Sequence, residues 1–241
     1  MKNKVTIELV NVTKRYQIKQ EKPTFFESLL VKNKRMIFTA LNQVSLKINQ
    51  GESVGIIGSN GAGKTTIIKV IAGITTPTSG KVIVRGSIVS IIDLSAGFHP
   101  DLVGQDNVLL NGLLLGMTKS EVKQKMESIR AFADIGEHFN APLFTYSSGM
   151  KLRLGFAIAI HANPSILLVD ESIMAGDEEF QIKAREKLVE LYKQKKTFVL
   201  VSHNLRYLKS TVNRIIWIDE GRVLQDGGHE VIDEYVLQSK H

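Results

Sequence analysis

Residues 58–66, which read Gly-Ser-Asn-Gly-Ala-Gly-Lys-Thr-Thr, constrain the fold of this chain more than any other stretch. They match the pattern Gly-x-x-x-x-Gly-Lys-Ser/Thr, a phosphate-binding loop when a buried strand precedes it and a helix follows. Residues 52–57 have the apolar pattern of such a strand, and residues 65–72 that of a helix start. We therefore predict a strand, a phosphate loop and a helix in succession, which implies an α/β fold.

Each residue type in this loop has a physical reason to be there. Glycines at positions 58, 61 and 63 permit positive φ, so successive backbone N–H groups can point at phosphate oxygens near a positive helix end. Lys64 would reach the β and γ phosphates, and the Thr65 hydroxyl would ligate Mg²⁺. A tight turn that binds no ligand would need neither the Lys64 ammonium nor the Thr65 hydroxyl. The expected nucleotide-binding residues are Gly58, Ser59, Asn60, Gly61, Ala62, Gly63, Lys64, Thr65 and Thr66.

Composition limits the classes of protein to which the chain can belong. Hydrophobic residues make up 43% and charged residues 23%, and no apolar run has the length of a membrane span or a signal-peptide core, so we expect a cytoplasmic protein. Zero cysteines exclude disulfides and thiol catalysis. The net charge of +7 suits nucleic acid or an anionic membrane, but no nucleic-acid recognition motif accompanies it, so we expect no nucleic acid partner.

The N-terminal part has the pattern of an antiparallel sheet beside the nucleotide core. Residues 5–12 and 41–48 alternate between apolar and polar, as half-buried strands do. Tyr16, just past the first strand, is a candidate to stack on a nucleobase, and packing at a strand end is the alternative. Between the strands, residues 23–35 predict a short amphipathic helix with a basic end, which would pack on its own domain or lie against lipids or a partner.

A helical segment interrupts the α/β pattern in the middle of the chain. After predicted strands at 81–84 and 87–92, residues 107–138 have helical periodicity, and Thr118 with Glu121 forms a capping box. We expect a helical subdomain here. Small polar residues then open a predicted helix at 151–161, and their hydroxyl and N–H groups suit either a second anion site or an ordinary N-cap.

Candidate catalytic groups follow the last buried strands. Residues 166–169 form a continuous apolar run, as expected of a central parallel strand, and Asp170 and Glu171 follow it. Asp170 would hold Mg²⁺ directly or through water, and Glu171 would orient and deprotonate the attacking water. His203, after a predicted strand at 197–201, can hydrogen-bond the γ-phosphate or that water.

The C-terminal part is predicted to add a hairpin and a helix. Residues 214–219 and 222–226 have the pattern of paired strands around a Glu-Gly turn. Residues 230–238 have that of a closing helix.

Four motifs occur here in the order found in the ATP-binding cassette (ABC) transporter ATPases, and the resemblance covers essentially the whole chain. They are the phosphate loop, the Ser-Ser-Gly stretch that opens a helix, the apolar strand that ends in Asp-Glu, and the Ser-His that follows the next strand. The resemblance implies a single α/β P-loop NTPase domain over residues 1–241, with a RecA-like mixed sheet core and ATP and Mg²⁺ as cofactors. An antiparallel β part would cover about residues 1–50, and the helical subdomain about residues 102–160.

The chain is similar, more narrowly, to the ATPase subunits that export bacterial O-antigen, capsule and teichoic acid. It has Tyr-Ser-Ser-Gly-Met at 146–150 where most cassettes have Leu-Ser-Gly-Gly-Gln, and Ser-Ala-Gly-Phe-His-Pro at 95–100. The insertion before the second strand resembles the gate helix of those exporters. This resemblance implies an ATPase at the cytoplasmic face of the inner membrane that drives transport of a lipid-linked polysaccharide through a transmembrane permease.

The same resemblance implies a head-to-tail homodimer. Each nucleotide would lie between one copy's phosphate loop and the other copy's Ser147, Ser148 and Gly149, and Asp177 would span the interface. The usual glutamine that senses Mg²⁺ is absent from residues 92–95, and Asp93 is the candidate to replace it as a metal ligand. Because the sequence stops soon after residue 238, we expect substrate selectivity to lie largely in the membrane subunit.

Two alternative functions stay open at this point. A non-transport cassette acting on nucleic acid or ribosomes would account for the net charge of +7. A cassette ATPase that moves a small solute would differ only in its membrane partner.

Overall fold

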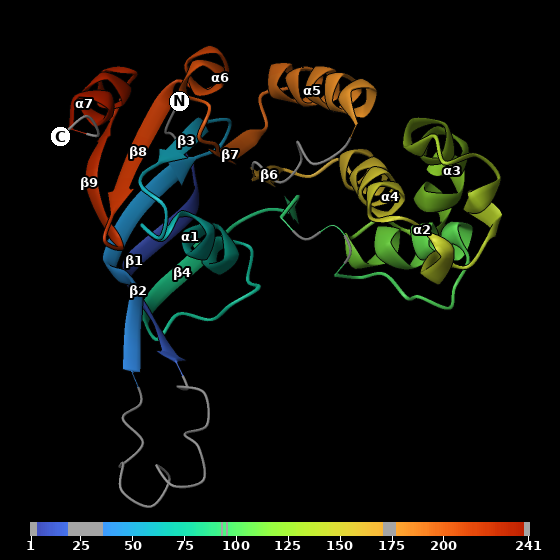
Figure 1. The fold of residues 1–241 in the computed structure, drawn as a ribbon, viewed down its shortest axis with the longest axis horizontal. Coiled ribbons are helices and arrows are strands. Elements are labelled where there is room, and N and C mark those ends of the chain that lie inside the picture. Colours follow the sequence, from blue (N-terminus) through green and yellow to red (C-terminus); the bar gives the residue numbers. More distant parts are fainter. Residues whose placement is uncertain (1–3, 19–35, 93, 95, 171–176, 239–241) are drawn as a thin grey trace, which may run out of the picture.

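The computed structural model describes residues 4–18, 36–92, 94, 96–170 and 177–238 (Figure 1). The insertion predicted at 23–35 lies outside the described residues. Within them, no helix combines the length and the apolar character needed to cross a bilayer. The helices and strands in chain order are β1 (Val5–Ile18), β2 (Met36–Asn49), β3 (Ser53–Ile57), α1 (Lys64–Ile71), β4 (Ser79–Val84), β5 (Ile88–Ser90), α2 (Gly104–Leu114), α3 (Lys119–Ala133), η2 (Gly136–Asn140), η3 (Leu143–Thr145), α4 (Ser148–His161), β6 (Ile166–Val169), α5 (Glu178–Lys193), β7 (Thr197–Val201), α6 (Leu205–Thr211), β8 (Arg214–Asp219), β9 (Arg222–Gly227) and α7 (Glu230–Gln238).

A six-stranded mixed sheet forms the centre of the molecule, in the order β5-β6-β7-β3-β8-β9. The first five strands are parallel, and β9 joins antiparallel to β8. Every residue of β3, β6 and β7 is buried, which explains why these strands are continuous apolar runs rather than alternating ones. Separate apolar cores cover the two faces of the sheet. This arrangement confirms the predicted mixed α/β fold.

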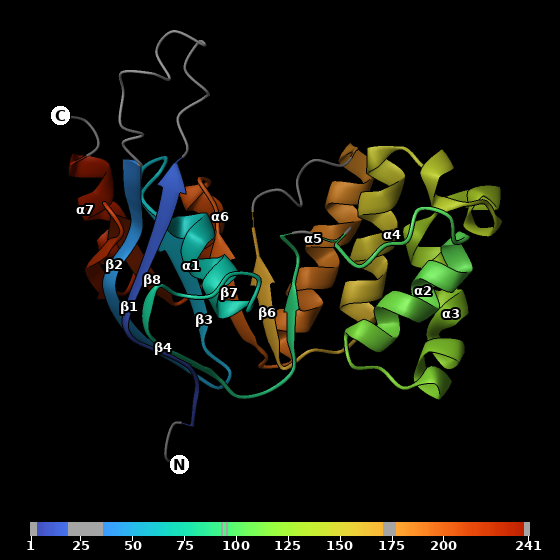
Figure 2. The same ribbon diagram turned by 90° about the horizontal axis from the view of Figure 1, so that it is seen from below.

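An antiparallel sheet of β2, β1 and β4 lies beside α1 (Figures 1 and 2). Its first two strands are longer than predicted, and beyond the end of β4 they continue as a two-stranded ribbon. Tyr16 therefore lies within β1, paired with Phe38, and the expectation that it follows the strand was wrong. The strand predicted at 81–84 is β4, which belongs to this sheet, and the one at 87–92 shortens to Ile88–Ser90.

Helices α2, α3 and α4 form a second lobe that lies to one side of both sheets in the two views (Figures 1 and 2). The lobe has an apolar core of its own, which includes Val108, Ile129 and Leu154. Both hydrogen bonds of the predicted capping box between Thr118 and Glu121 are present at the start of α3.

Two helices have no counterpart in the sequence-based prediction, namely α5 and α6. The buried side chains of α5 are spaced by three or four residues, from Phe180 and Ala184 to Leu188 and Leu191, and they pack in the core on one face of the central sheet. Interspersed charged residues on its exposed side lower the mean hydropathy of this segment, which obscured the pattern.

Arg214, at the start of β8, joins the two sheets. Its guanidinium donates two hydrogen bonds of 2.7 Å to the carboxylate of Asp226, one of 3.1 Å to Glu52 and one of 2.9 Å to the backbone carbonyl of Lys47. The paired carboxylate of Asp226 raises the pKa of Arg214 above its usual range. Because Lys47 belongs to β2 and Glu52 precedes β3, this one side chain fixes the antiparallel sheet to the central sheet.

We predict that Arg214→Gln lowers the free energy of unfolding by about 1 to 2 kcal/mol, since it removes charge-assisted hydrogen bonds at a partly exposed site. Urea denaturation followed by circular dichroism measures the change. Lys81→Gln, a charge-matched change at an exposed position of β4, is the control and should cost much less. Equal losses in the two variants would show that Arg214 does not join the sheets.

Candidate nucleotide-binding site

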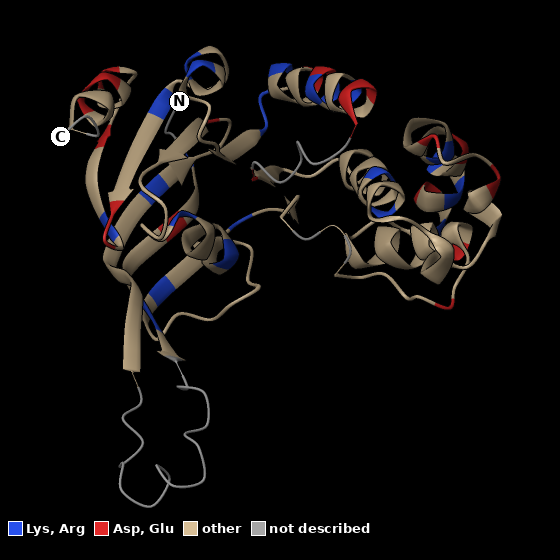
Figure 3. Ribbon diagram, in the orientation of Figure 1, with Lys and Arg blue, Asp and Glu red and all other residues tan. Residues whose placement is uncertain are grey.

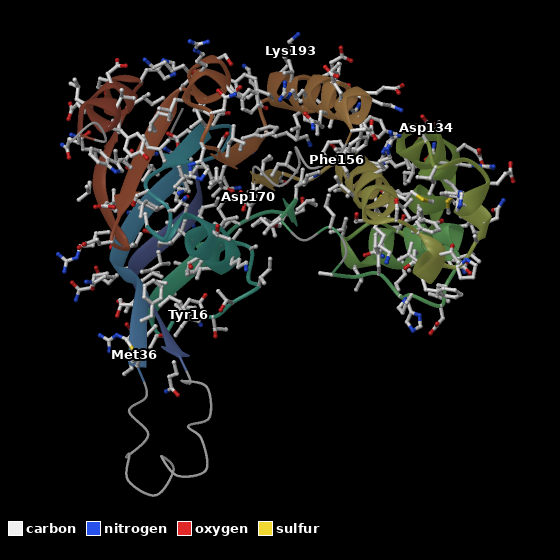
Figure 4. All side chains as sticks on the ribbon, viewed as in Figure 1. Tyr16, Met36, Asp134, Phe156, Asp170 and Lys193 are labelled. Carbon is white, nitrogen blue, oxygen red and sulfur yellow. The ribbon has the colours of Figure 1, made fainter. Side chains whose placement is uncertain are left out.

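Three buried parallel strands end together at one edge of the central sheet. Ile56 of β3 pairs with Val201 of β7, and Leu200 of β7 pairs with Val169 of β6. The residues that follow these strands, which are Gly58, Ser202 and Asp170, therefore lie next to one another along the edge, where ligands bind in open α/β sheets. Figure 4 labels Asp170 there.

The phosphate loop has the backbone expected from its glycines. Gly58, Gly61 and Gly63 have φ angles of 150°, 81° and 107°. A Cβ atom on Gly58 would lie 2.0 Å from the carbonyl oxygen of Ile218, and one on Gly63 would lie 2.5 Å from that of Ala40, whereas one on Gly61 would meet nothing within 4 Å. The loop is thus packed against the end of β8 and against β2 by contacts between backbones.

Lys64, the first residue of α1, lies at the centre of the loop. Its side chain is buried, with the residue only 7% exposed, and Nζ donates hydrogen bonds of 2.8 Å to the carbonyls of Gly58 and Ser59. The N-cap of α1 is Gly63, and no side chain caps the helix, so its first N–H groups are turned toward the loop. A cation beside an uncapped helix N-terminus favours an anion at this position.

The residues around the loop fit a nucleotide with its magnesium ion. Among the described residues no group of three or more acidic, histidine or cysteine side chains could hold a metal alone. A hydroxyl from Thr65, a carboxylate from Asp170 and phosphate oxygens are the kinds of donor that Mg²⁺ takes in phosphate sites, where it keeps several waters, so these residues would suit it. Thr65 is exposed and Asp170 half-buried, so both are accessible from the sheet edge.

Tyr16 is positioned by contacts with the segment that follows α1. Nζ of Lys14 donates to the carbonyl of Thr76 at 2.8 Å and lies 5.0 Å from the centre of the Tyr16 ring. The backbone N–H of Arg15 donates to the hydroxyl of Thr78. Tyr16 is 37% exposed on the antiparallel sheet (Figure 4), so part of its side chain is accessible.

His203 is held at the same sheet edge by a tight turn. Ser202, which precedes it, is buried, and its hydroxyl accepts a hydrogen bond of 3.0 Å from the N–H of Asn204. The side chain of Asn204 then caps α6 by accepting from the N–H of Tyr207. His203 is exposed between these two fixed residues.

The small polar residues at 147–149 open α4 in the helical lobe. The Ser147 hydroxyl accepts a 3.2 Å hydrogen bond from the N–H of Met150, so it is an N-cap, while Ser147 and Ser148 are both exposed. Tyr146 is buried, its hydroxyl donates to the carbonyl of His138 at 2.5 Å, and burial raises its pKa. Since α1 and the start of α4 lie in separate lobes in both views (Figures 1 and 2), this stretch does not complete the phosphate loop of its own chain.

Asp177 is tied to the same helix by a residue that the sequence-based prediction missed. Its carboxylate caps α5 by accepting from the N–H of Phe180, and it accepts a 2.6 Å hydrogen bond from Nη2 of Arg153 in α4. The hydrogen bond from Arg153 is the main reason that the pKa of Asp177 is lowered. Arg153 also lies over the ring of Phe180 and 3.8 Å from the carboxylate of Asp134. The aspartate is therefore positioned from the helical lobe.

A second missed residue is Asn107, which is fully buried in α2. Its amide donates to the carbonyls of His99, Leu102 and Val103 and accepts from the N–H of His99 at 2.8 Å. It thereby fixes the segment at 98–103 to the helical lobe. The sequence signal that could have identified Asn107 is a polar residue within an apolar helical pattern.

Some predicted residues lie outside the described part of the chain. They are Glu171, the expected base, and Asp93, the expected substitute for the missing glutamine. Their roles stay predictions.

Comparison with known proteins points to one family. The family model described as "ABC transporter" matches residues 41–174. The chain is 44% identical, over 95% of its length, to an O-antigen export system ATP-binding protein of Myxococcus xanthus, of which it spans about half (54%). It is 40% identical to a teichoic acids export ATP-binding protein of Listeria monocytogenes, over 98% of this chain and 71% of the relative. With an O-antigen export system ATP-binding protein of Klebsiella pneumoniae it shares 36% identity over 97% of this chain and 98% of the relative.

Solved structures agree with this result. The dimeric post-hydrolysis structure of the ATP-binding cassette MJ0796 with ADP and phosphate superposes with a TM-score of 0.71 and 26% identity, over 92% of this chain and 98% of that one. The ATP-binding subunit of an ABC transporter gives a TM-score of 0.75 at 19% identity, over 96% of this chain and 93% of that one, which is a likeness of fold alone.

We predict that Gly58→Ala lowers the free energy of unfolding by about 3 kcal/mol or more, because the methyl group would strike a backbone carbonyl and the φ angle disfavours a side chain. Gly61→Ala, the matched control, has open space and should cost about 1 kcal/mol from its φ angle alone. Chemical denaturation compares the two. The proposed packing of the loop against β8 fails if the two losses are alike.

Proposed function

We propose, because the chain belongs to the ABC transporter family, that it is the ATP-hydrolysing subunit of an exporter for a lipid-linked polysaccharide such as O-antigen, capsule or teichoic acid. The observation that carries the ATPase assignment is structural. A buried lysine and an uncapped helix N-terminus meet at the carboxyl edge of a parallel sheet, beside Asp170 and His203. The names of the relatives support the class of cargo.

We treat residues 1–241 as one ATPase domain. The antiparallel part takes in about residues 1–50, including the insertion at about 23–35, and the helical subdomain takes in about residues 102–160. The separate apolar core of the helical lobe supports this division.

The loop at the sheet edge would bind the phosphates. Lys64 and the first N–H groups of α1 would bind their oxygens, and Thr65 with Asp170 would ligate Mg²⁺. When bound, the metal neutralises charge on the phosphates and helps to orient them. Tyr16 would stack on the base. To bind a phosphate, Nζ of Lys64 would exchange one of the two loop carbonyls to which it now donates for a phosphate oxygen. The flexible lysine side chain would make this exchange by a short movement.

Hydrolysis would use two further side chains. Glu171 would orient the attacking water and accept its proton, a role that contributes about 10²- to 10⁴-fold. His203 would hydrogen-bond the γ-phosphate, where charge develops as the bond to it breaks. Both follow buried parallel strands, so the rigid sheet would set their positions.

A second copy of the chain would close the site. The exposed helix start at Ser147, Ser148 and Gly149 has hydroxyl and N–H groups that its own chain does not direct at its phosphate loop. In a head-to-tail dimer these groups would bind the phosphates held by the other copy, with Asp177 at the interface. The dimeric state named for the MJ0796 cassette supports this arrangement.

ATP binding would then close the dimer, and hydrolysis would let it open. A transmembrane permease whose two states bind the open and closed dimers with different affinity would be switched by this cycle. The ATPase would lie peripherally on the cytoplasmic face of the membrane.

We predict that Glu171→Gln retains ATP binding but slows turnover by about 10²- to 10⁴-fold, because the water loses its base. Steady-state phosphate release and fluorescent-nucleotide binding measure the two quantities. Glu186→Gln, at an exposed position of α5, is the matched control and should keep the wild-type rate. Undiminished turnover in Glu171→Gln would remove this residue as the base.

A further inference from the structure

The part of the β1–β2 ribbon that lies beyond its pairing with β4 exposes a run of large apolar side chains. Met36, Ile37 and Phe38 are 57%, 63% and 46% exposed. Among the residues that the structure describes, no other three consecutive large apolar side chains are exposed. They pair with the end of β1, from Ile18↔Met36 to Tyr16↔Phe38, beyond the last pairing of β1 with β4 at Thr13↔Ser79. Among the described residues no third strand pairs with this part of the ribbon, so Met36 and Phe38 are exposed on one face and Ile37 on the other.

Most of the chain's excess positive charge lies in the same stretch of sequence. Residues 14–38 contain seven Lys or Arg against two Glu, a net +5 of the total +7. The described part of this stretch, residues 14–18 and 36–38, holds Lys14 and Arg15 and no acidic residue (Figure 3). The rest of the chain carries a net charge of only +2, the difference between +7 and +5, so most of the net charge is local to this part of the sequence.

We propose that the ribbon end, defined as Arg15, Met36, Ile37 and Phe38, binds the surface of an anionic lipid bilayer. Apolar side chains beside basic ones match the bilayer interface, where the former enter between headgroups and the latter pair with lipid phosphates. Binding at a membrane surface gains from buried apolar area and from attraction to anionic lipids together, and the ribbon end has side chains of both kinds. A folded ribbon has already ordered its backbone, so little entropy is lost on binding.

Nucleic acid fits the ribbon end less well. It would use the positive charge, and Phe38 could stack on a base, but the aliphatic side chains of Met36 and Ile37 would stay exposed to water. The bilayer is the occupant that uses the apolar and basic residues at once. This binding needs neither ATP nor a permease, and it would add a direct lipid contact to the proposed function.

The test is co-sedimentation of the full chain, without nucleotide, with vesicles of phosphatidylcholine alone or mixed with phosphatidylglycerol. The wild type should bind the anionic vesicles, bind the neutral ones much more weakly, and lose binding as salt rises. Met36→Ser combined with Ile37→Ser should weaken anionic-vesicle binding by about tenfold or more, since the apolar contact is lost. Arg15→Gln should weaken it by roughly fivefold and leave binding to neutral vesicles unchanged.

The matched control is Leu224→Ser combined with Leu237→Ser, because these leucines are 50% and 66% exposed on β9 and α7, away from the ribbon. It should bind vesicles like the wild type. Thermal unfolding and ATP turnover of every variant, measured without vesicles, separate loss of lipid binding from loss of fold or of the proposed activity. The Met36 and Ile37 variant should keep both.

Three results would overturn the proposal. One is a wild type that does not bind anionic vesicles, or binds neutral ones equally well. Another is full vesicle binding by the Met36→Ser and Ile37→Ser variant. The third is salt-sensitive binding of an RNA oligonucleotide in the absence of vesicle binding, which would assign the charge to nucleic acid.

Discussion

The rest of the structure depends on the placement of one cation, the Lys64 ammonium, in a buried position at the edge of the central sheet. Its charge is stabilised by the carbonyls of Gly58 and Ser59, and placing it there needs a loop with positive φ angles at three glycines, Gly58, Gly61 and Gly63. The loop can only do so because Gly58 and Gly63 let it pack directly against the backbone of Ile218 and Ala40. Strand order then brings Asp170 and His203 to the same edge.

The proposed site residues are divided between the two lobes. The sheet lobe holds the phosphate loop and the groups that follow β6 and β7, whereas the helical lobe holds the exposed start of α4. Arg153 links the lobes, because it extends from α4 to Asp177 at the start of α5, whose Phe180 ring packs 5.6 Å from Phe156 of α4. A movement of the helical lobe would therefore carry Asp177 with it, which suits a residue at an interface between two copies.

The sequence was sufficient for features that depend on local pattern. The phosphate loop, the buried strands and the capping box of Thr118 each follow from residues close together in the chain. The length of β1 and β2 was underestimated because the added residues, 13–18 and 36–40, are mostly exposed and lack the alternation of apolar and polar residues that marks a half-buried strand. The pair of Arg153 and Asp177 was missed because its members come from different elements, and no local pattern joins them.

The central claim is that one chain supplies half of an ATP site, and light scattering on Glu171→Gln with ATP tests it most directly. The chain has a mass of 26.8 kDa, and the account predicts a species of twice that mass when ATP is bound. When Ser148→Arg, at an exposed position, is combined with Glu171→Gln, the protein should keep the mass of one chain. Each chain should still bind ATP at its phosphate loop. A single mass with tightly bound ATP in Glu171→Gln, or a doubled mass that Ser148→Arg leaves unchanged, would contradict it.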